Sequence, residues 1–248
     1  MYLEPIFSSD DINKQLPLES TRFNTVDQKW KKNMAQAIKN PGVIDYCANE
    51  KLLIDFQESN KLLELVSKGL NDYLETKRAG FARFYFLSND ELLEILSQTK
   101  DPRAVQPHLR KCFEAIASLK FEDDLAMTEM VSGEGERVPF TYPLYPKGNV
   151  EDWLTQVEKM MKRSVREQMD HALQVYYDMA RPDWVAAENH PAMCVINGSQ
   201  YFWTLELEDK ITTSQTKGVV EYKAQALAQI DDLINLVRGK MTCSSSSA

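Results

Sequence analysis

The sequence is poor in the residues that build most metal and nucleotide sites. Its 248 residues include only 9 glycines, 4 cysteines and 3 histidines. The cysteines Cys47, Cys112, Cys194 and Cys243 are far apart and show no paired spacing, which is typical of a reduced intracellular compartment. No glycine-rich turn ends in Gly-Lys-Ser or Gly-Lys-Thr, so the sequence has no P-loop for a nucleotide phosphate.

Long apolar runs and a basic surface are also missing. No stretch approaches about 18 uninterrupted apolar residues, so we expect no membrane-spanning helix. Residues 1–5 lack the basic and apolar regions of a signal peptide. The net charge is −8, whereas proteins that bind nucleic-acid backbones usually carry a basic face. We therefore expect neither a membrane nor a nucleic-acid partner. Apolar residues make up 43% and charged residues 27%, which is ordinary for a soluble folded protein.

The hydrophobic spacing is mostly that of helices. Apolar residues recur every three or four positions, and this spacing predicts helices at 9–16, 25–38, 51–77, 88–96, 107–119, 149–176 and 219–237. Residues 191–207 are ambiguous between helix and strand, and helix is favoured. Thr25 with Gln28, and Ser88 with Glu91, have the spacing of capping boxes at helix starts. Arg181-Pro182 is expected to end the helix that Asn149 begins.

Two regions depart from this spacing. The aromatic-rich residues 81–87 are predicted to form a strand or extended connector. The segments 126–131 and 137–142 flank the turn SGEGE at 132–136, which predicts a small β-hairpin. We therefore predict a mainly α fold, an elongated bundle of long packed helices with a small β-hairpin insertion. Its expected parts are a helical subdomain at 1–120, the hairpin with further helices at 121–241, and a disordered tail at 242–248.

No catalytic, cofactor-binding or metal-binding residues emerge from the sequence. His108 and Cys112 could share a helix face, but two ligands do not make a zinc site and no second pair is close in sequence. The pair Asp123-Asp124 resembles the magnesium-binding aspartates of helical prenyl-diphosphate enzymes. Such a lyase or transferase needs a third carboxylate about one turn on, where this chain has Met127.

Several segments resemble one protein family. They are residues 2–7, 16–19, 71–78, 84–96 (FYFLSNDELLEIL), 99–102, 106–113 (QPHLRKCF), 132–136, 150–154 (VEDWL) and 236–239. Together they resemble the linker of dynein heavy chains, specifically of the axonemal inner-arm type. The resemblance extends from residue 2 to about residue 241.

The resemblance implies a mechanical role. In dyneins the linker is a helical lever between the tail and a ring of AAA+ modules, and the ring binds ATP and Mg²⁺. The expected partners are that ring, the intermediate and light chains through the tail, and microtubules through the parent motor. The expected location is the cytoplasm, the cytoskeleton and the axoneme of a cilium. A static helical scaffold or adaptor is the alternative function.

Two groups of residues are candidates for the mechanics. The acidic turn and its flank are predicted to dock on the ring, through Glu134, Glu136 and Arg137. Hinges are sought in connectors, where packing is expected to be thinnest; the candidates are Gly80, Asp101, Pro102, Pro146 and Gly148.

Overall fold

The structure is a computed structural model that describes residues 7, 10–97, 101–187 and 190–239. By internal contact the chain forms two compact units. Unit 1 comprises Met1–Met127 and Leu144–Val157, and unit 2 comprises Thr128–Pro143 and Glu158–Ala248. Two subdomains that meet at residue 120 were expected from the sequence, and that division stays a prediction. The expected disordered tail at 242–248 lies outside the described residues.

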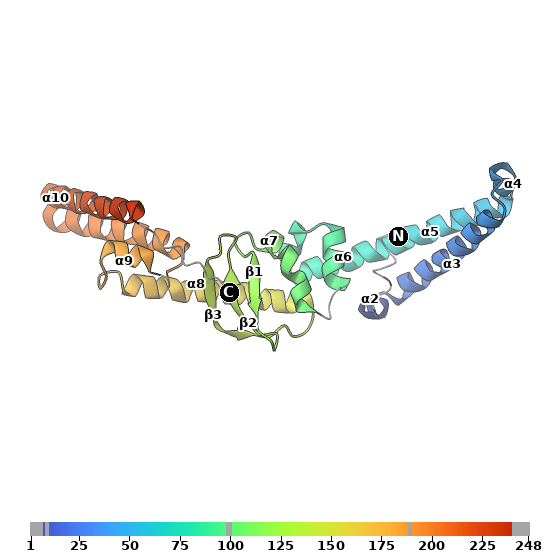
Figure 1. The fold of residues 1–248 in the computed structure, drawn as a ribbon, viewed down its shortest axis with the longest axis horizontal. Helices are drawn as coiled ribbons and strands as arrows, with labels where there is room; N and C mark the ends of the chain where they lie inside the picture. The colour runs from blue at the N-terminus through green and yellow to red at the C-terminus, as the bar shows by residue number, and fades with distance from the viewer. Residues whose placement is uncertain (1–6, 8–9, 98–100, 188–189, 240–248) are drawn as a thin grey trace. The chain divides into compact units, whose positions relative to one another are not determined.

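The described residues are mostly helical and include a three-stranded antiparallel sheet, which confirms the predicted fold class (Figure 1). The elements, in chain order, are α2 Asp10–Gln15, α3 Pro17–Lys39, α4 Val43–Cys47, α5 Glu50–Gly80, η1 Ala82–Phe86, α6 Asn89–Ser97, η2 Pro102–His108, α7 Leu109–Cys112, β1 Ser118–Phe121, β2 Met127–Val131, β3 Arg137–Leu144, α8 Val150–Gln174, α9 Arg181–Ala186 and α10 Ala192–Arg238. Among the described helices, none combines the length and the apolar character needed to cross a bilayer.

Unit 1 contains two long helices that pack side by side, α3 and α5 (Figure 1). The Lys29 ammonium on α3 donates to Glu58 Oε2 on α5 at 2.7 Å, and the Trp30 and Phe56 rings lie 6.2 Å apart. Helix α5 confirms the helix predicted at 51–77. Its 31 residues extend about 46 Å at the α-helical rise.

Helix α3 begins at Pro17, so the predicted start at Thr25 is wrong. Proline fits the first turn of a helix because its missing N–H would have no intrahelical acceptor there. Thr25 lies inside the helix, where its Oγ1 donates to the Thr21 carbonyl at 2.9 Å. The capping-box spacing at Thr25 was therefore coincidental. The spacing at Ser88 is a real capping box, since Ser88 N donates to Glu91 Oε2 and Glu91 N donates to Ser88 Oγ.

The aromatic run at 81–87 forms the 3₁₀ helix η1, so the predicted strand is wrong. A 3₁₀ helix has three residues per turn, which places Phe81 and Phe84 on one side. Both rings are buried, with centroids 5.1 Å apart in an edge-to-face contact. The other side presents Tyr85 and Phe86, which are 59% and 69% exposed.

The helix predicted at 107–119 is also wrong, because this stretch contains the end of η2, the short helix α7 and the strand β1. The side chain of Gln106 explains the strand. Its Nε2 donates to the Leu119 carbonyl at 2.6 Å, and its Oε1 accepts from Leu119 N at 2.9 Å. This amide satisfies the main chain of Leu119 as a neighbouring strand would. The sheet has the order β1-β2-β3, so it contains one strand more than the predicted hairpin.

Unit 2 contains the predicted hairpin loop and most of the C-terminal helices. Within the loop, Ser132 N donates to the Glu136 carbonyl at 2.8 Å, and Gly135 takes the left-handed φ of +89° that glycine tolerates best. Helix α8 ends at Gln174, before the predicted end at Arg181-Pro182. Pro182 instead lies in the first turn of α9, where a proline is compatible with a helix.

Helix α10 is a pair of helical arms, because the chain reverses at Gln215 with φ 46° and ψ −129° (Figure 1). A Cβ at Gly218 would meet the Lys210 carbonyl oxygen at 2.2 Å, so only glycine fits this close approach. Gln225 Nε2 on the second arm donates to Glu206 Oε2 on the first at 3.1 Å. The two arms confirm the helices predicted at 191–207 and 219–237.

The interior of unit 2 is centred on Trp184, whose side chain is fully buried. Its Nε1 donates to the Ala172 carbonyl at 2.8 Å, and it packs with Ala172 and Cys194. The ring also lies directly against Gly198, where a Cβ would stand 3.1 Å from two ring carbons. Trp184 thus joins α8, α9 and the first arm of α10.

Candidate functional site

The last turn of α5 carries two adjacent cations, Lys77 and Arg78, which are each 9% exposed. Each side chain bonds to a different element of unit 1, so α5 is tied to α8 by one and to the segment after η1 by the other. We call Lys77, Arg78, Glu151 and Asn89 the α5 junction. Cations near a helix C-terminus are favourable, because the last carbonyls carry partial negative charge.

Lys77 forms a buried ion pair with Glu151 in the first turn of α8. The Nζ–Oε1 distance is 2.5 Å, and each side chain is 11% exposed. Lys77 Nζ also lies 5.5 Å from the centre of the Tyr73 ring. The second oxygen of Glu151, Oε2, is buried without an acceptor or donor partner among the described residues. Glu151 therefore depends on Lys77 for the compensation of its charge.

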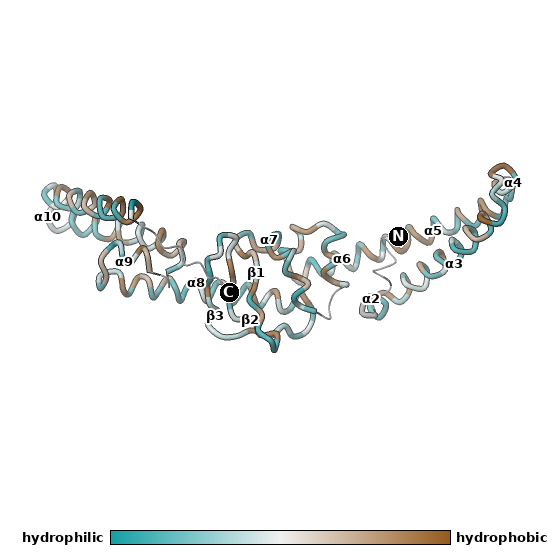
Figure 2. Tube along the Cα trace, viewed as in Figure 1, coloured by the Kyte–Doolittle hydropathy of each residue, from teal (hydrophilic) through white to brown (hydrophobic). Residues whose placement is uncertain are grey.

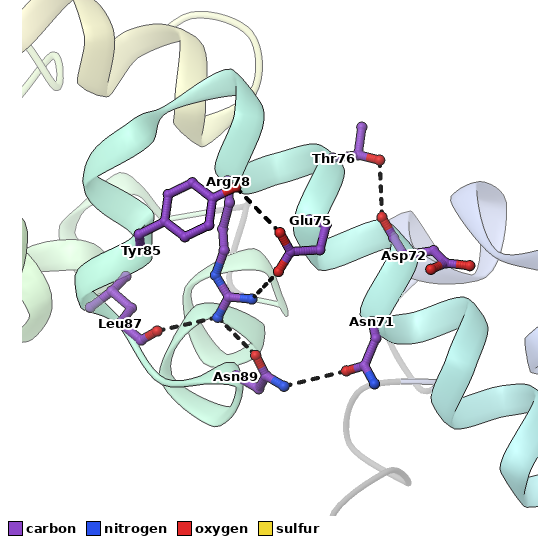
Figure 3. Close-up of polar contacts among 8 residues, drawn as sticks. All are labelled: Asn71, Asp72, Glu75, Thr76, Arg78, Tyr85, Leu87 and Asn89. Carbon is purple, nitrogen blue, oxygen red and sulfur yellow. Dashed lines mark hydrogen bonds and ion pairs between the residues drawn. The ribbon is translucent and has the colours of Figure 1, made fainter.

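Arg78 is the centre of a polar network that Figure 3 shows. Its Nη2 donates to the Leu87 carbonyl at 3.2 Å and to Asn89 Oδ1 at 2.8 Å, while Nη1 pairs with Glu75 Oε1 at 3.0 Å. Tyr85 OH donates to the other oxygen of Glu75 at 3.3 Å. One guanidinium thus fixes η1 and the start of α6 against the end of α5.

Sequence reasoning missed the α5 junction. Residues 71–78 belong to the segments that resemble the dynein family, and they end in two cations in the last turn of an apolar helix. That pattern was the available signal. The pattern does not indicate which residue accepts from Lys77, however, because Glu151 is 74 residues away in the chain. Only the tertiary structure brings the two together.

The three residues predicted to dock on the ring lie on the β2–β3 loop and the first position of β3. Glu134 is exposed at the loop tip. Glu136 instead accepts a hydrogen bond through Oε1 from Ala192 N, at 2.7 Å, where α10 begins. A carboxylate there is favourable for the helix, because the first N–H groups have no intrahelical acceptor. Arg137 Nη1 lies 3.7 Å from Glu129 Oε2.

The five predicted hinge residues occupy different environments within unit 1. Gly80 is packed, since a Cβ there would meet Glu151 Cγ at 3.3 Å. Asp101 accepts from Arg103 N and so begins η2, with Pro102 as its first residue. Pro146 and Gly148 lie in the connector between β3 and α8, where Gly148 has a φ of +82°. The hinge assignments stay predictions.

The described residues hold no group of three or more His, Cys, Asp or Glu side chains placed to bind a metal ion. Two thiols are shielded by burial, which raises the pKa of Cys112 to about 11 and also raises the pKa of Cys194. A thiol that stays protonated is a poor nucleophile. Cys112, which was weighed with His108 as a zinc ligand from the sequence and set aside, is therefore protonated at neutral pH.

Comparison with known proteins gives the family. Residues 1–172 match the family described as "Dynein heavy chain, N-terminal region 2". Over 242 residues the chain is 51% identical to dynein axonemal heavy chain 1 of Homo sapiens, a match that covers 98% of this chain and 6% of that protein. It is 46% identical over 245 residues to two Mus musculus proteins, dynein axonemal heavy chains 3 and 12, and covers 6% and 8% of them.

The chain thus spans less than a tenth of the length of these relatives. The family match confirms the resemblance to axonemal dynein heavy chains that was inferred from the sequence segments. All three relatives are axonemal heavy chains by name, which confirms the expected location in the axonemal cytoskeleton of a cilium. The chain belongs to the dynein heavy chain family, as part of the N-terminal region of an axonemal heavy chain.

Proposed function

We propose that this chain is the central segment of the linker of its heavy chain, a lever that transmits ATP-driven changes of an AAA+ ring to the tail. The observation that carries the proposal is the match over 98% of the chain to axonemal dynein heavy chains. In this proposal the chain has no catalytic site. ATP and Mg²⁺ are held by the ring, and the tail and the parent motor supply the contacts with intermediate chains, light chains and microtubules.

The geometry of unit 1 supports a mechanical role. A lever transmits force well when its interior deforms little, and closely packed protein interiors have low compressibility. Helices α3 and α5 pack along one another, and the α5 junction ties the end of α5 to α6 and α8. These connections use buried charged groups, whose separation would leave a charge without its partner. The junction is therefore costly to open under load.

Movement of the lever can be tested in an intact axonemal dynein heavy chain. A donor fluorophore is attached at Ile44→Cys in α4, a position that is 85% exposed, and an acceptor is attached to the ring. We expect the transfer efficiency between the two dyes to change when ATP and vanadate are added to the nucleotide-free motor. A second donor site at Ile38→Cys, 81% exposed on α3, controls for local effects of the dye.

The same measurement separates the lever from the alternative function, a static scaffold or adaptor. A static element keeps one distance to the ring in every nucleotide state. If the transfer efficiency at each donor site is the same in every nucleotide state, in a motor that still hydrolyses ATP, the lever is refuted.

The ring-docking part of the proposal now depends mainly on Glu134. The Glu136 carboxylate also accepts from Ala192 N at the start of α10. Its replacement would therefore remove this hydrogen bond as well as change the charge of the loop. Glu134→Lys changes the loop charge alone. If the loop docks on a basic surface, we expect Glu134→Lys to reduce microtubule gliding speed by up to about fivefold, since an exposed ion pair contributes about 0–1 kcal/mol.

The matched control is Glu208→Lys, which makes the same charge change at an exposed position of α10. Gliding speed should stay near that of the wild type in this control. Docking through the loop is excluded if Glu134→Lys glides as fast as the control.

A further inference from the structure

Unit 2 contains a groove with a volume of about 330 Å³ that none of the expected functions uses. It is lined by residues from both arms of α10, by the first residue of α9 and by the turn that follows α8. The lining residues that matter here are Tyr176, Arg181, Ser199, Trp203, Tyr222 and Ile230. Arg181 is the one cation among the described lining residues, which combine aromatic and aliphatic side chains with the polar side chains of Ser199, Gln200 and Gln229.

Arg181 lies beside two aromatic rings, Tyr176 and Trp184, which contact each other edge to face. Its Cζ lies 5.5 Å from the centre of Tyr176 and 4.9 Å from the centre of Trp184. These contacts stabilise the faces of the guanidinium but leave its in-plane N–H groups in need of acceptors. Nη2 donates to Ser199 Oγ at 2.6 Å. Nε and Nη1 are buried and have no acceptor among the described residues.

Buried donors without acceptors are rare in folded proteins, since each one loses its hydrogen bonds to water. Arg181 lines the groove, so an acceptor that enters the groove can supply the hydrogen bonds that the described residues do not. A carboxylate is the acceptor best matched to a guanidinium in both charge and geometry. The groove thus favours a ligand that carries a carboxylate.

The apolar surface next to Arg181 extends beyond the groove along the second arm of α10. Trp203 at the rim is 56% exposed and Ile230 is 51% exposed. Ile230 belongs to an exposed stripe whose members are Val220, Leu227, Ile230, Ile234 and Val237. Both arms carry such hydrophobic stretches (Figure 2).

The spacing of the stripe identifies the shape of the ligand. Val220, Leu227 and Ile234 are spaced by seven residues, and Ile230 and Val237, also seven residues apart, follow Leu227 and Ile234 by three residues each. This is the heptad spacing of the apolar residues through which two helices pack in a coiled coil. The stripe is also longer than the surface that a small molecule would cover. The occupant is therefore a helix with an apolar face.

We propose that this groove and stripe bind an amphipathic helix of a partner polypeptide, with a carboxylate side chain of that helix on Arg181. Its apolar side chains cover the stripe and Trp203. The proposal assigns an interaction surface to unit 2 and does not depend on whether the chain moves as a lever.

The proposal can be tested with the 248-residue chain and synthetic helical peptides. The fluorescein-labelled probes have leucine at the coiled-coil core positions and a single glutamate, placed at each remaining position in turn. Each probe has a twin in which glutamine replaces the glutamate. We expect at least one glutamate probe to bind, as measured by fluorescence anisotropy. Its glutamine twin should bind at least about tenfold more weakly, because it loses a charge-assisted hydrogen bond.

Exposed positions of the stripe provide variants that leave the interior intact. Ile234→Asp places a charge in the stripe and is expected to abolish probe binding, whereas Ile211→Asp makes the same change at an exposed position outside the stripe and groove and should not. Arg181→Lys keeps the charge but loses the planar group, so we expect weaker binding of the glutamate probe. The peptide twins test the carboxylate even if this variant folds poorly.

Three results would overturn the proposal. One is the absence of binding by every probe. Another is equal binding by a glutamate probe and its twin, since the carboxylate would then have no role. The third is a dimer of the chain in analytical ultracentrifugation that Ile234→Asp converts to a monomer, because a second copy would then occupy the stripe.

Discussion

Replacing Lys77 with methionine is expected to destabilise the chain by about 3–5 kcal/mol, because it leaves the buried carboxylate of Glu151 without a counter-charge. The Glu151 side chain is only 11% exposed, and its Oε2 already has no partner among the described residues. Water therefore cannot replace the lost ammonium. Urea unfolding of the purified chain, followed by circular dichroism, measures the change as a lower midpoint.

Two further variants separate the buried charge from simple truncation. In the double variant Lys77→Met with Glu151→Leu neither position of the buried pair carries a charge, so we expect most of the lost stability to return. Lys162→Met removes an exposed partner of Glu158, with the lysine side chain 68% exposed, and should cost less than about 1 kcal/mol. If the double variant is no more stable than Lys77→Met, the buried charge is not the cause.

Replacing Trp184 with alanine is expected to destabilise unit 2 by about 3–5 kcal/mol, the usual effect of removing a large buried aromatic side chain. The substitution also leaves the Ala172 carbonyl without the indole donor. Because Trp184 packs against α8 and Gly198 of α10, its removal should loosen several elements together. Hydrogen exchange measured by mass spectrometry should show reduced protection in α8, α9 and α10.

The matched control is Trp203→Ala, which removes the same side chain from a position that is 56% exposed. Its unfolding midpoint should stay close to that of the wild type, because little buried area is lost. A Trp184→Ala protein as stable as this control would contradict the central role of Trp184 in unit 2.

Sequence reasoning was most successful where local signals and burial agree. Helix α5 was predicted to within a few residues from its regular apolar spacing, and in the structure the Asn49 side chain caps its start by accepting from Lys51 N. The Ser88 capping box was identified from two residues alone. Signals of this kind are contained in a few neighbouring residues and do not depend on distant partners.

Two of the errors arose where side-chain contacts, rather than local propensity, decide the conformation. The strand β1 depends on the amide of Gln106, which bonds to both main-chain groups of Leu119. The aromatic run at η1 satisfies either an extended or a 3₁₀ periodicity, and the burial of Phe81 and Phe84 selects the second. The local sequence does not distinguish these alternatives, because their intrinsic energies are close and packing supplies the difference.

By itself the sequence determined the helical class, the hairpin loop and the family, since hydrophobic periodicity and matched segments are properties of residue order. Only the tertiary structure decided which charges are buried together. It paired Lys77 with Glu151 and placed the Glu136 carboxylate at the first N–H groups of α10. It also left two nitrogens of Arg181, beside a groove, without acceptors among the described residues. The reason is physical: the cost of burying a charge depends on what surrounds it in space, and distance along the chain carries no information about that.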